Sequence, residues 1–387
     1  MEPMMPKDCR ELDDKAVELI EKSSAFAGML NADVALSVGH LVRSMNCYYS
    51  NFIEGHDTHP RDIERALNED FDTSPEKRDL QKEAKAHIDV QSLIDKGESP
   101  ANALSKEFAL WAHKEFCDRL PESMLWAENP DTGERIPVIP GELRETFVDV
   151  GRHRPPGPDE LDRYLARFEE AYMPATHSRI RRVIAVAAAH HRFAWIHPFI
   201  DGNGRVARLM SHAYLKQMGI GSSLWSVSRG MARTAGDYKR LLQAADSPRN
   251  GPLDGRGALS EKALTGFCEY FLDICIDQVD FMSRSLNLKS LQVRIERYCA
   301  HEVALKNLMA GSWPLLREAL LSGEFKRGMA AEIIGKSPAQ ARKVLGILTQ
   351  KGLLVSDTEK GPVQLGLPLD VLDEWMPGLG YAANSRN

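Results

Sequence analysis

The sequence lacks any apolar run long enough to cross a lipid bilayer. Its longest run, Val183–Ala189, is far shorter than the roughly 20 residues that a membrane helix needs. Residues 1–30 alternate acidic side chains with short apolar runs and contain no apolar core of a secretory signal. We therefore expect a cytoplasmic protein that is not associated with a membrane.

Paired cysteines and an excess of positive charge are missing as well. The six cysteines form no CxxC pair, which favours free thiols in a reducing compartment over a disulfide framework. The formal net charge is −6, so the whole molecule lacks the positive field of an obligate nucleic-acid binder. Any contact with DNA must therefore be local.

Apolar residues are plentiful and mostly follow a helical period. With 387 residues, of which 43% are hydrophobic, the chain can bury more than one core. We expect a helical N-terminal region over 1–110, a catalytic core over 111–295 and a C-terminal module over 296–387. Spacings of three and four residues predict helices from the cap Asn31 to near Gly55, and over 108–120, 161–172 and 178–196.

A short β-hairpin is the one expected departure from helix in the first three quarters. Apolar residues between Arg135 and Val150 cluster around Pro140-Gly141, which is a typical turn pair. Stretches rich in proline and glycine predict loops over 152–158 and 245–257.

The C-terminal pattern predicts a winged helix-turn-helix module. Short helices are expected over 315–321, 329–334 and 339–350, followed by strands over 353–356 and 363–367. The expected recognition helix is basic, although the module as a whole is nearly balanced in charge; its basic residues are Lys336, Arg342, Lys343 and Lys351. DNA binding and docking to a protein, including dimer contacts, both remain open for this module.

The segment from His197 to Arg208 carries the chemistry. Proline at 198 disfavours helical backbone at His197, so the preceding helix ends there and presents the imidazole at a turn. Gly202-Asn203-Gly204 then allow close backbone approach just before a helix that begins near Arg205. Backbone amides and the helix dipole converge there, which predicts an anion site.

Charged side chains complete this segment. Arg205 and Arg208 add positive charge, and the Asp201 carboxylate is suited to hold Mg²⁺ beside a phosphate. An imidazole, a metal carboxylate and a phosphate cradle within twelve residues predict phosphoryl or nucleotidyl transfer.

The string from His197 to Arg208 matches every defined position of the Fic motif, H-x-F-x-D/E-G-N-G-R-x-x-R. Residues 30–275 resemble Fic-family nucleotidyltransferases, whose fold is an α-helical bundle with one small hairpin flap. The resemblance implies transfer of AMP from ATP to a Tyr, Thr or Ser hydroxyl of a target protein, with release of pyrophosphate. His197 would be the general base, and self-modification and a homo-oligomer are expected.

The resemblance also assigns the remaining roles. Asp201 would bind Mg²⁺, and Arg205 and Arg208 would neutralise the outer phosphates. Tyr238 would lie near the adenine, with packing in the core as its alternative. The α- and β-phosphates would be held by Gly202, Asn203 and Gly204, and the flap residues that dock the target would be Glu142, Leu143, Arg144, Thr146, Phe147 and Val148.

A second match lies upstream. Residues 50–55 fit the inhibitory pattern S/T-x-x-x-E-G/N, which implies the class with an N-terminal inhibitory helix. Glu54 would then pair with Arg208 and withdraw it from ATP, and Ser50 would help to hold the helix. The alternative is a solvated helix end capped by Gly55.

The sequence is also compatible with three other functions. A metal-dependent phosphohydrolase could use His190, His191, His197 and Asp201, but adjacent helical residues point about 100° apart and cannot both face one ion. The same machinery could instead remove AMP, with Glu54 activating water, or transfer another phosphate-containing group. The C-terminal module could make the chain a DNA-binding regulator.

Overall fold

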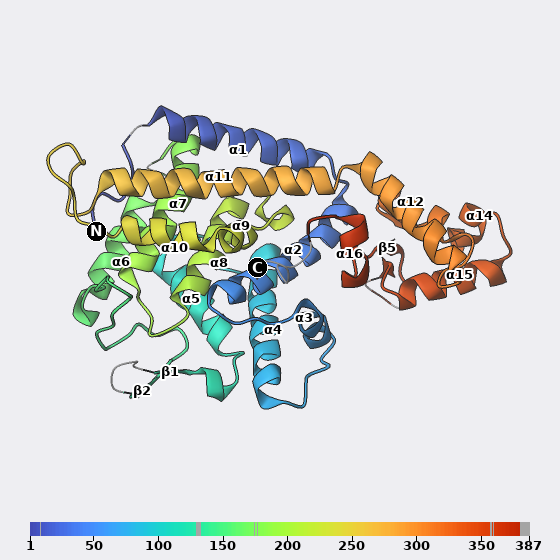
Figure 1. The fold of residues 1–387 in the computed structure, drawn as a ribbon, viewed down its shortest axis with the longest axis horizontal. Helices are drawn as coiled ribbons and strands as arrows, with labels where there is room; N and C mark the ends of the chain where they lie inside the picture. The colour runs from blue at the N-terminus through green and yellow to red at the C-terminus, as the bar shows by residue number, and fades with distance from the viewer. Residues whose placement is uncertain are drawn as a thin grey trace. The chain divides into compact units, whose positions relative to one another are not determined.

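The computed structural model describes residues 1–7, 9–128, 133–173, 175, 177–356, 358 and 360–379. The chain is mainly α-helical, as predicted, and none of the helices in these described ranges combines the length and apolarity needed to cross a membrane (Figure 1). The helices are α1 Arg10–Gly28, α2 Ala32–Ile53, α3 Pro60–Leu67, α4 Pro75–Lys96, α5 Lys106–Cys117, α6 Leu161–Ala171, α7 Arg179–Ile196, α8 Asn203–Gln217, α9 Val227–Arg233, α10 Ala235–Ala244, α11 Glu261–Ser285, α12 Leu288–Ala304, α13 Ser312–Ser322, α14 Ala330–Ile334, α15 Pro338–Gln350 and α16 Leu369–Trp375.

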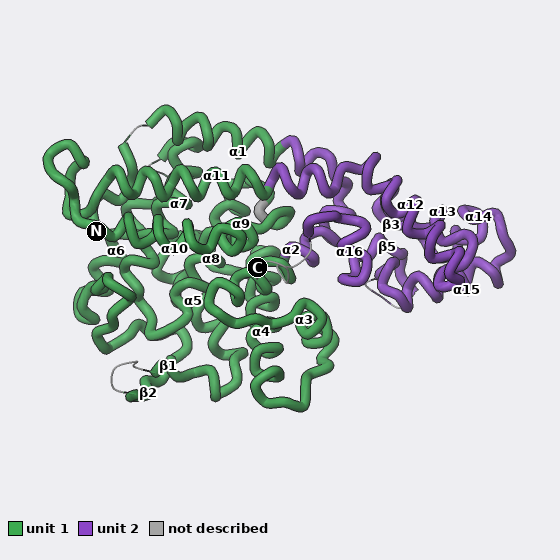
Figure 2. Tube along the Cα trace, in the orientation of Figure 1, with its two compact units in different colours: residues 1–24, 43–278 green, residues 25–42, 279–387 purple. Residues whose placement is uncertain are grey.

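The chain divides into two compact units (Figure 2). Unit 1 comprises residues 1–24 and 43–278, and unit 2 comprises residues 25–42 and 279–387. The division falls within α1, α2 and α11, which differs from the expected boundaries at 110/111 and 295/296. Assignment of residues 25–42 to unit 2 depends on contacts with residues far along the chain, which local sequence patterns do not carry. The three-part division by function stays a prediction.

The core of unit 1 is built around α7. Ser178 caps this helix by accepting a hydrogen bond from the Arg181 amide at 3.3 Å. Its run of small and β-branched residues, Val183–Ala189, is almost fully buried, because α7 packs against α6 and α8. The same unit places α1 beside α11, where Lys15 pairs with Asp273 (Figure 1). A buried central helix of this kind gives a rigid base to the turn at its C-terminus.

The predicted hairpin around Pro140-Gly141 is wrong. The strands of unit 1 are β1 Trp126–Glu128 and β2 Arg135–Pro137, which pair antiparallel ahead of that position. Gly141 has a φ of 77°, and a Cβ there would lie 2.9 Å from the Lys114 Cβ. A glycine is therefore needed at position 141 because the chain passes close to α5, and not because it forms a hairpin turn.

Unit 2 contains three helices and two strands close to the positions predicted for the C-terminal module. These are α13, α14 and α15, followed by β4 Leu354–Val355 and β5 Val363–Leu365. A further strand, β3 Glu324–Phe325, follows α13, and the sheet has the antiparallel order β3-β5-β4. The helices bury their apolar faces, including Val344, Leu345 and Leu348 of α15.

Candidate active site

The turn after α7 holds His197 in a strained conformation. Its φ of 49° and ψ of 61° are left-handed, which costs a residue other than glycine about 1 kcal/mol. The His197 amide donates to the Phe193 carbonyl at 3.1 Å, and its carbonyl accepts from Arg144 Nε at 2.8 Å. Contacts on both sides therefore fix the position from which the imidazole projects.

The His197 imidazole is neutral at physiological pH. Burial, and after it the Arg144 charge, lower its pKa to about 4, and the hydrogen bond with the Ala194 backbone opposes this only in part. An unprotonated ring nitrogen is what a general base needs.

The loop from Pro198 to Gly202 is closed by the side chain of Asn203. Its Nδ2 donates to the Phe199 carbonyl, and its Oδ1 accepts from the Phe199 amide, each at 2.9 Å. The Phe199 ring is buried and stacks on His113 with 3.9 Å between centroids and 3° between planes. Asn203 thus contributes its side chain to the shape of the loop.

The N-terminus of α8, where the sequence predicts an anion site, follows directly. Gly202, with φ of 82°, precedes the first helical residue, and the first intrahelical bond runs from the Val206 amide to the Gly202 carbonyl at 3.0 Å. The amides before Val206 point out of the helix end, where the dipole favours negative charge. Asp201 is exposed at the same place, and its carbonyl contacts His113 Nε2 at 3.2 Å.

The predicted contact between Glu54 and Arg208 is present. Arg208 Nη2 donates to Glu54 Oε1 at 2.5 Å, and Arg208 Nε donates to Ser50 Oγ at 2.8 Å. Burial alone would raise the pKa of the Glu54 carboxyl, but the charges of Arg208 and Arg205 outweigh it and lower the pKa. A Cβ on Gly204 would overlap Glu54 Oε1, so the carboxylate lies directly against the first turn of α8.

The two motif arginines face different partners. Arg205 is 5% exposed and pairs with the buried Glu83 of α4, and its guanidinium lies 5.4 Å from the Phe116 ring centroid. His56 completes this cluster, with Nδ1 2.7 Å from Glu83 Oε2, and this hydrogen bond raises the pKa of His56. The structure thus places the Arg205 charge against α4, whereas Arg208 lies under the end of α2.

Comparison with known proteins identifies the segment that contains His197, Asp201, Arg205 and Arg208. Residues 103–215 match the Fic/DOC family. They form a Fic domain. The family resemblance inferred from the string between His197 and Arg208 is therefore confirmed.

Relatives of the Fic domain carry one common name. Protein adenylyltransferase Fic of Drosophila grimshawi is 42% identical over 87 residues, which cover 22% of this chain and 18% of that protein. The protein of the same name from Drosophila yakuba is 31% identical over 137 residues, covering 35% of this chain and 28% of that protein. The chain thus spans less than a third of the length of these relatives.

Solved structures share the fold. A Fic family protein from Desulfovibrio desulfuricans matches with a TM-score of 0.51 and 17% identity, covering 92% of this chain and 96% of that one. A Fic domain containing signaling protein from Bacteroides thetaiotaomicron also has a TM-score of 0.51, with 18% identity over 70% of this chain and 97% of that one. The mainly helical fold class predicted from the sequence agrees with both.

Within the segment expected to form the flap, Arg144 does not lie on a docking surface. Its side chain is 3% exposed and donates to the carbonyls of His197, Thr146 and Pro156. The guanidinium fork satisfies three carbonyls of two loops, which is why it turns inward. Phe147 is 64% exposed, Glu142 and Thr146 are also exposed, and Leu143 and Val148 are half-buried.

Tyr238 lies in the core beside the Fic motif. It is 5% exposed, and its hydroxyl is 2.9 Å from His190 Nε2, while His190 Nδ1 is 2.9 Å from Ser211 Oγ. The arrangement agrees with the core-packing alternative, in which Tyr238 supports α7 from α10. Its place beside an adenine stays a prediction.

Sequence patterns missed the role of His113. Its Nδ1 accepts from the Gly141 amide at 2.9 Å, so Nε2 carries the proton and donates to the Asp201 carbonyl. One imidazole thereby joins α5, the segment before Arg144 and the loop from Pro198 to Gly202. The only local signal was a histidine among the apolar residues on one face of α5.

A polar stripe on α4 was also missed, although its spacing is visible in the sequence. Residues at four-residue intervals on this helix lie against α2 and α8 in unit 1. Gln91 and both nitrogens of His87 have no hydrogen-bond partner among the described residues, and these two side chains line a small pocket with Arg208. The stripe consists of Glu83, His87, Gln91 and Asp95.

The residues of the rival metal site have separate partners. His190 contacts Ser211 and Tyr238, whereas His191 Nε2 lies 3.0 Å from Asp246 Oδ1.

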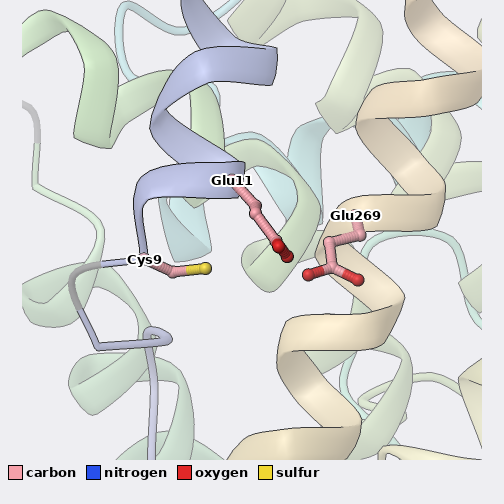
Figure 3. Close-up of side chains that lie close together, drawn as sticks. All are labelled: Cys9, Glu11 and Glu269. Carbon is pink, nitrogen blue, oxygen red and sulfur yellow. The ribbon is translucent and has the colours of Figure 1, made fainter.

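Elsewhere in the described part of the chain, three potential metal ligands lie close together on α1, its preceding loop and α11 (Figure 3). Burial and the nearby Glu11 raise the pKa of the Glu269 carboxyl; the three are Cys9, Glu11 and Glu269.

Proposed function

We propose that the chain transfers AMP from ATP to a Tyr, Thr or Ser hydroxyl on a target protein, including its own chain, and releases pyrophosphate. The observation that carries the proposal is a neutral His197 imidazole at a turn that leads into the N-terminus of α8. A base beside an anion site suits attack of a hydroxyl on a phosphate. The name shared by the relatives supports the same reaction.

In this reaction the target hydroxyl oxygen bonds to the α-phosphorus. The bond from that phosphorus to the oxygen that bridges to the β-phosphate breaks, and pyrophosphate leaves with the electron pair. His197 takes the hydroxyl proton. Arg144 and the Phe193 carbonyl fix the His197 backbone, which holds the base at the turn before α8.

The phosphates and Mg²⁺ are assigned to the start of α8. The amides of Gly202, Asn203 and Gly204 bind the α- and β-phosphates, and the exposed Asp201 carboxylate holds Mg²⁺. The fit rests on a hard oxygen ligand beside a phosphate nest, with the Asp201 carbonyl fixed by His113. When bound, Mg²⁺ neutralises phosphate charge.

The Glu54–Arg208 pair makes the resting enzyme autoinhibited. Arg208 is the arginine that reaches toward the phosphate loop, and in this conformation its guanidinium is divided between Ser50 and Glu54. A γ-phosphate that loses this partner settles in a pose that misaligns the α-phosphate for attack. Exposed residues near Phe147 dock the extended segment of the target.

Label position tests the reaction. Protein incubated with Mg²⁺ and ATP should acquire label from the α-phosphate and none from the γ-phosphate. The Glu54→Gly variant is used to obtain a strong signal, and His197→Ala in the same background serves as control. Transfer of γ-label, or α-label transfer that persists in the His197→Ala control, would contradict the proposal.

Removal of AMP is a second candidate, favoured by the position of Glu54. Its carboxylate, with a lowered pKa, lies against the phosphate loop and is 32% exposed, so it can activate a water. Labelled target incubated with wild-type protein would then release AMP, and Glu54→Gln would abolish the release.

A further inference from the structure

Basic and acidic residues in the C-terminal part of unit 2 lie in separate segments. From Gly335 to Ser356 the chain has four basic residues and no acidic one, whereas acids gather on α16. Arg342, Lys343 and Lys351 are exposed, and no ion pair involving them occurs among the described residues. A module that is balanced overall therefore concentrates positive charge on α15 and at its two ends; the basic residues are Lys336, Arg342, Lys343 and Lys351.

The composition of that face distinguishes it from a protein-docking surface. Ala341, Val344, Leu345 and Leu348 turn inward, and the opposite side of α15 carries small or polar residues apart from the half-buried Ile347. Among these, Ala339 and Gly346 leave the backbone accessible, and a Cβ on Gly346 would meet nothing within 4 Å. Protein interfaces usually centre on clusters of large apolar anchors, whereas the one large apolar residue on this side of α15, Ile347, is half-buried.

The elements before α15 place it as the second helix of a helix-turn-helix, which is the position of a recognition helix. The short α14 leads through Gly335, with φ of 63°, into the cap Ser337, which accepts a hydrogen bond from the Gln340 amide at 3.4 Å. The sheet β3-β5-β4 packs behind the helices. A helix of this length spans about 20 Å and fits a DNA major groove about 12 Å wide.

We propose that unit 2 binds duplex DNA through the exposed face of α15. Arg342, Lys343 and Lys351 contact backbone phosphates, and the amides of Gln340 and Gln350 face the base edges. The binding adds a second activity to the chain and does not depend on AMP transfer.

Fluorescence anisotropy of the full chain with a labelled duplex of about 20 bp tests the proposal, over roughly 50 to 200 mM salt. The variant Arg342→Ala with Lys343→Ala should bind at least about tenfold more weakly at low salt. The slope of log affinity against log salt should also shrink by about 2, because two phosphate contacts are lost.

The matched control is Arg297→Ala with Lys306→Ala. It removes the same charge from exposed positions of unit 2 outside α15, and it should bind DNA like the wild type. Equal losses in the two variants would overturn the proposal, since general charge would then explain the binding. So would absence of duplex binding at low salt, or an equally large effect of the α15 variant on dextran sulfate or single-stranded RNA.

Discussion

Arg208 and Glu54 form an ion pair whose two partners differ sharply in exposure. The Arg208 side chain is 3% exposed, whereas that of Glu54 is 32% exposed. Glu54 can therefore be withdrawn into water at low cost, while Arg208 keeps its bonds to Ser50. The asymmetry makes the Glu54 side chain, just beyond the end of α2, the group that moves when the pair opens.

Glu54→Gly should raise α-label transfer by on the order of 10²-fold, because Arg208 becomes available to ATP. The loss of stability should be about 1 kcal/mol, since Ser50 still holds the guanidinium. Label incorporation and urea unfolding measure the two effects. Arg208→Ala should not activate, because it removes the phosphate ligand along with the inhibition. Equal activation by both changes would count against the inhibitory pair.

The pH profile of the Glu54→Gly variant should stay flat down to about pH 5. The depressed pKa of His197, about 4, keeps its imidazole unprotonated across that range, so activity is lost only as pH falls through the folded-state pKa. Initial rates with saturating MgATP give the profile, and circular dichroism checks that the protein remains folded. An acid limb centred near the ordinary histidine value of about 6.5 would refute a buried, neutral base.

His87→Leu should stabilise the protein by about 1 kcal/mol. Both ring nitrogens are buried without a partner among the described residues, and burial lowers the pKa to about 3. The unfolded state therefore binds a proton that the folded state excludes, and the gain should grow as pH falls below about 6.5. Urea unfolding at several pH values measures it. His190→Leu, which removes an equally buried but hydrogen-bonded imidazole, should destabilise instead.

Arg144→Met should slow AMP transfer by on the order of 10²-fold while ATP affinity is unchanged. The change keeps the aliphatic stem but removes the donor to the His197 carbonyl, so the strained turn loses its anchor. Single-turnover rates and ATP titration separate the two quantities. Arg152→Met, at an exposed position in the same part of the chain, should match the parent protein. Weaker ATP binding with an unchanged rate would assign Arg144 to the nucleotide instead.

Local patterns predicted the parts of the site that depend on neighbouring residues. Pro198 and Gly202 determine where α7 ends and α8 begins, and the family motif led from Glu54 to Arg208. The direction of Arg205 could not be foreseen, because Glu83 becomes its partner only when α4 packs against α8. The inward positions of Arg144 and Gly141 could not be foreseen for the same reason. Both looked like flap residues in sequence, and their inward positions depend on His197 and α5.

The paired bonds between Asn203 and Phe199 have a thermodynamic consequence for ligand binding. Ordering a flexible residue costs about 1–2 kcal/mol of conformational entropy, and a mobile phosphate loop would meet that cost each time a nucleotide entered. Here the loop is ordered when the chain folds, because one amide side chain satisfies both backbone groups of Phe199. Weakening this closure should therefore reduce nucleotide affinity through the entropy of binding, even where every phosphate contact is retained.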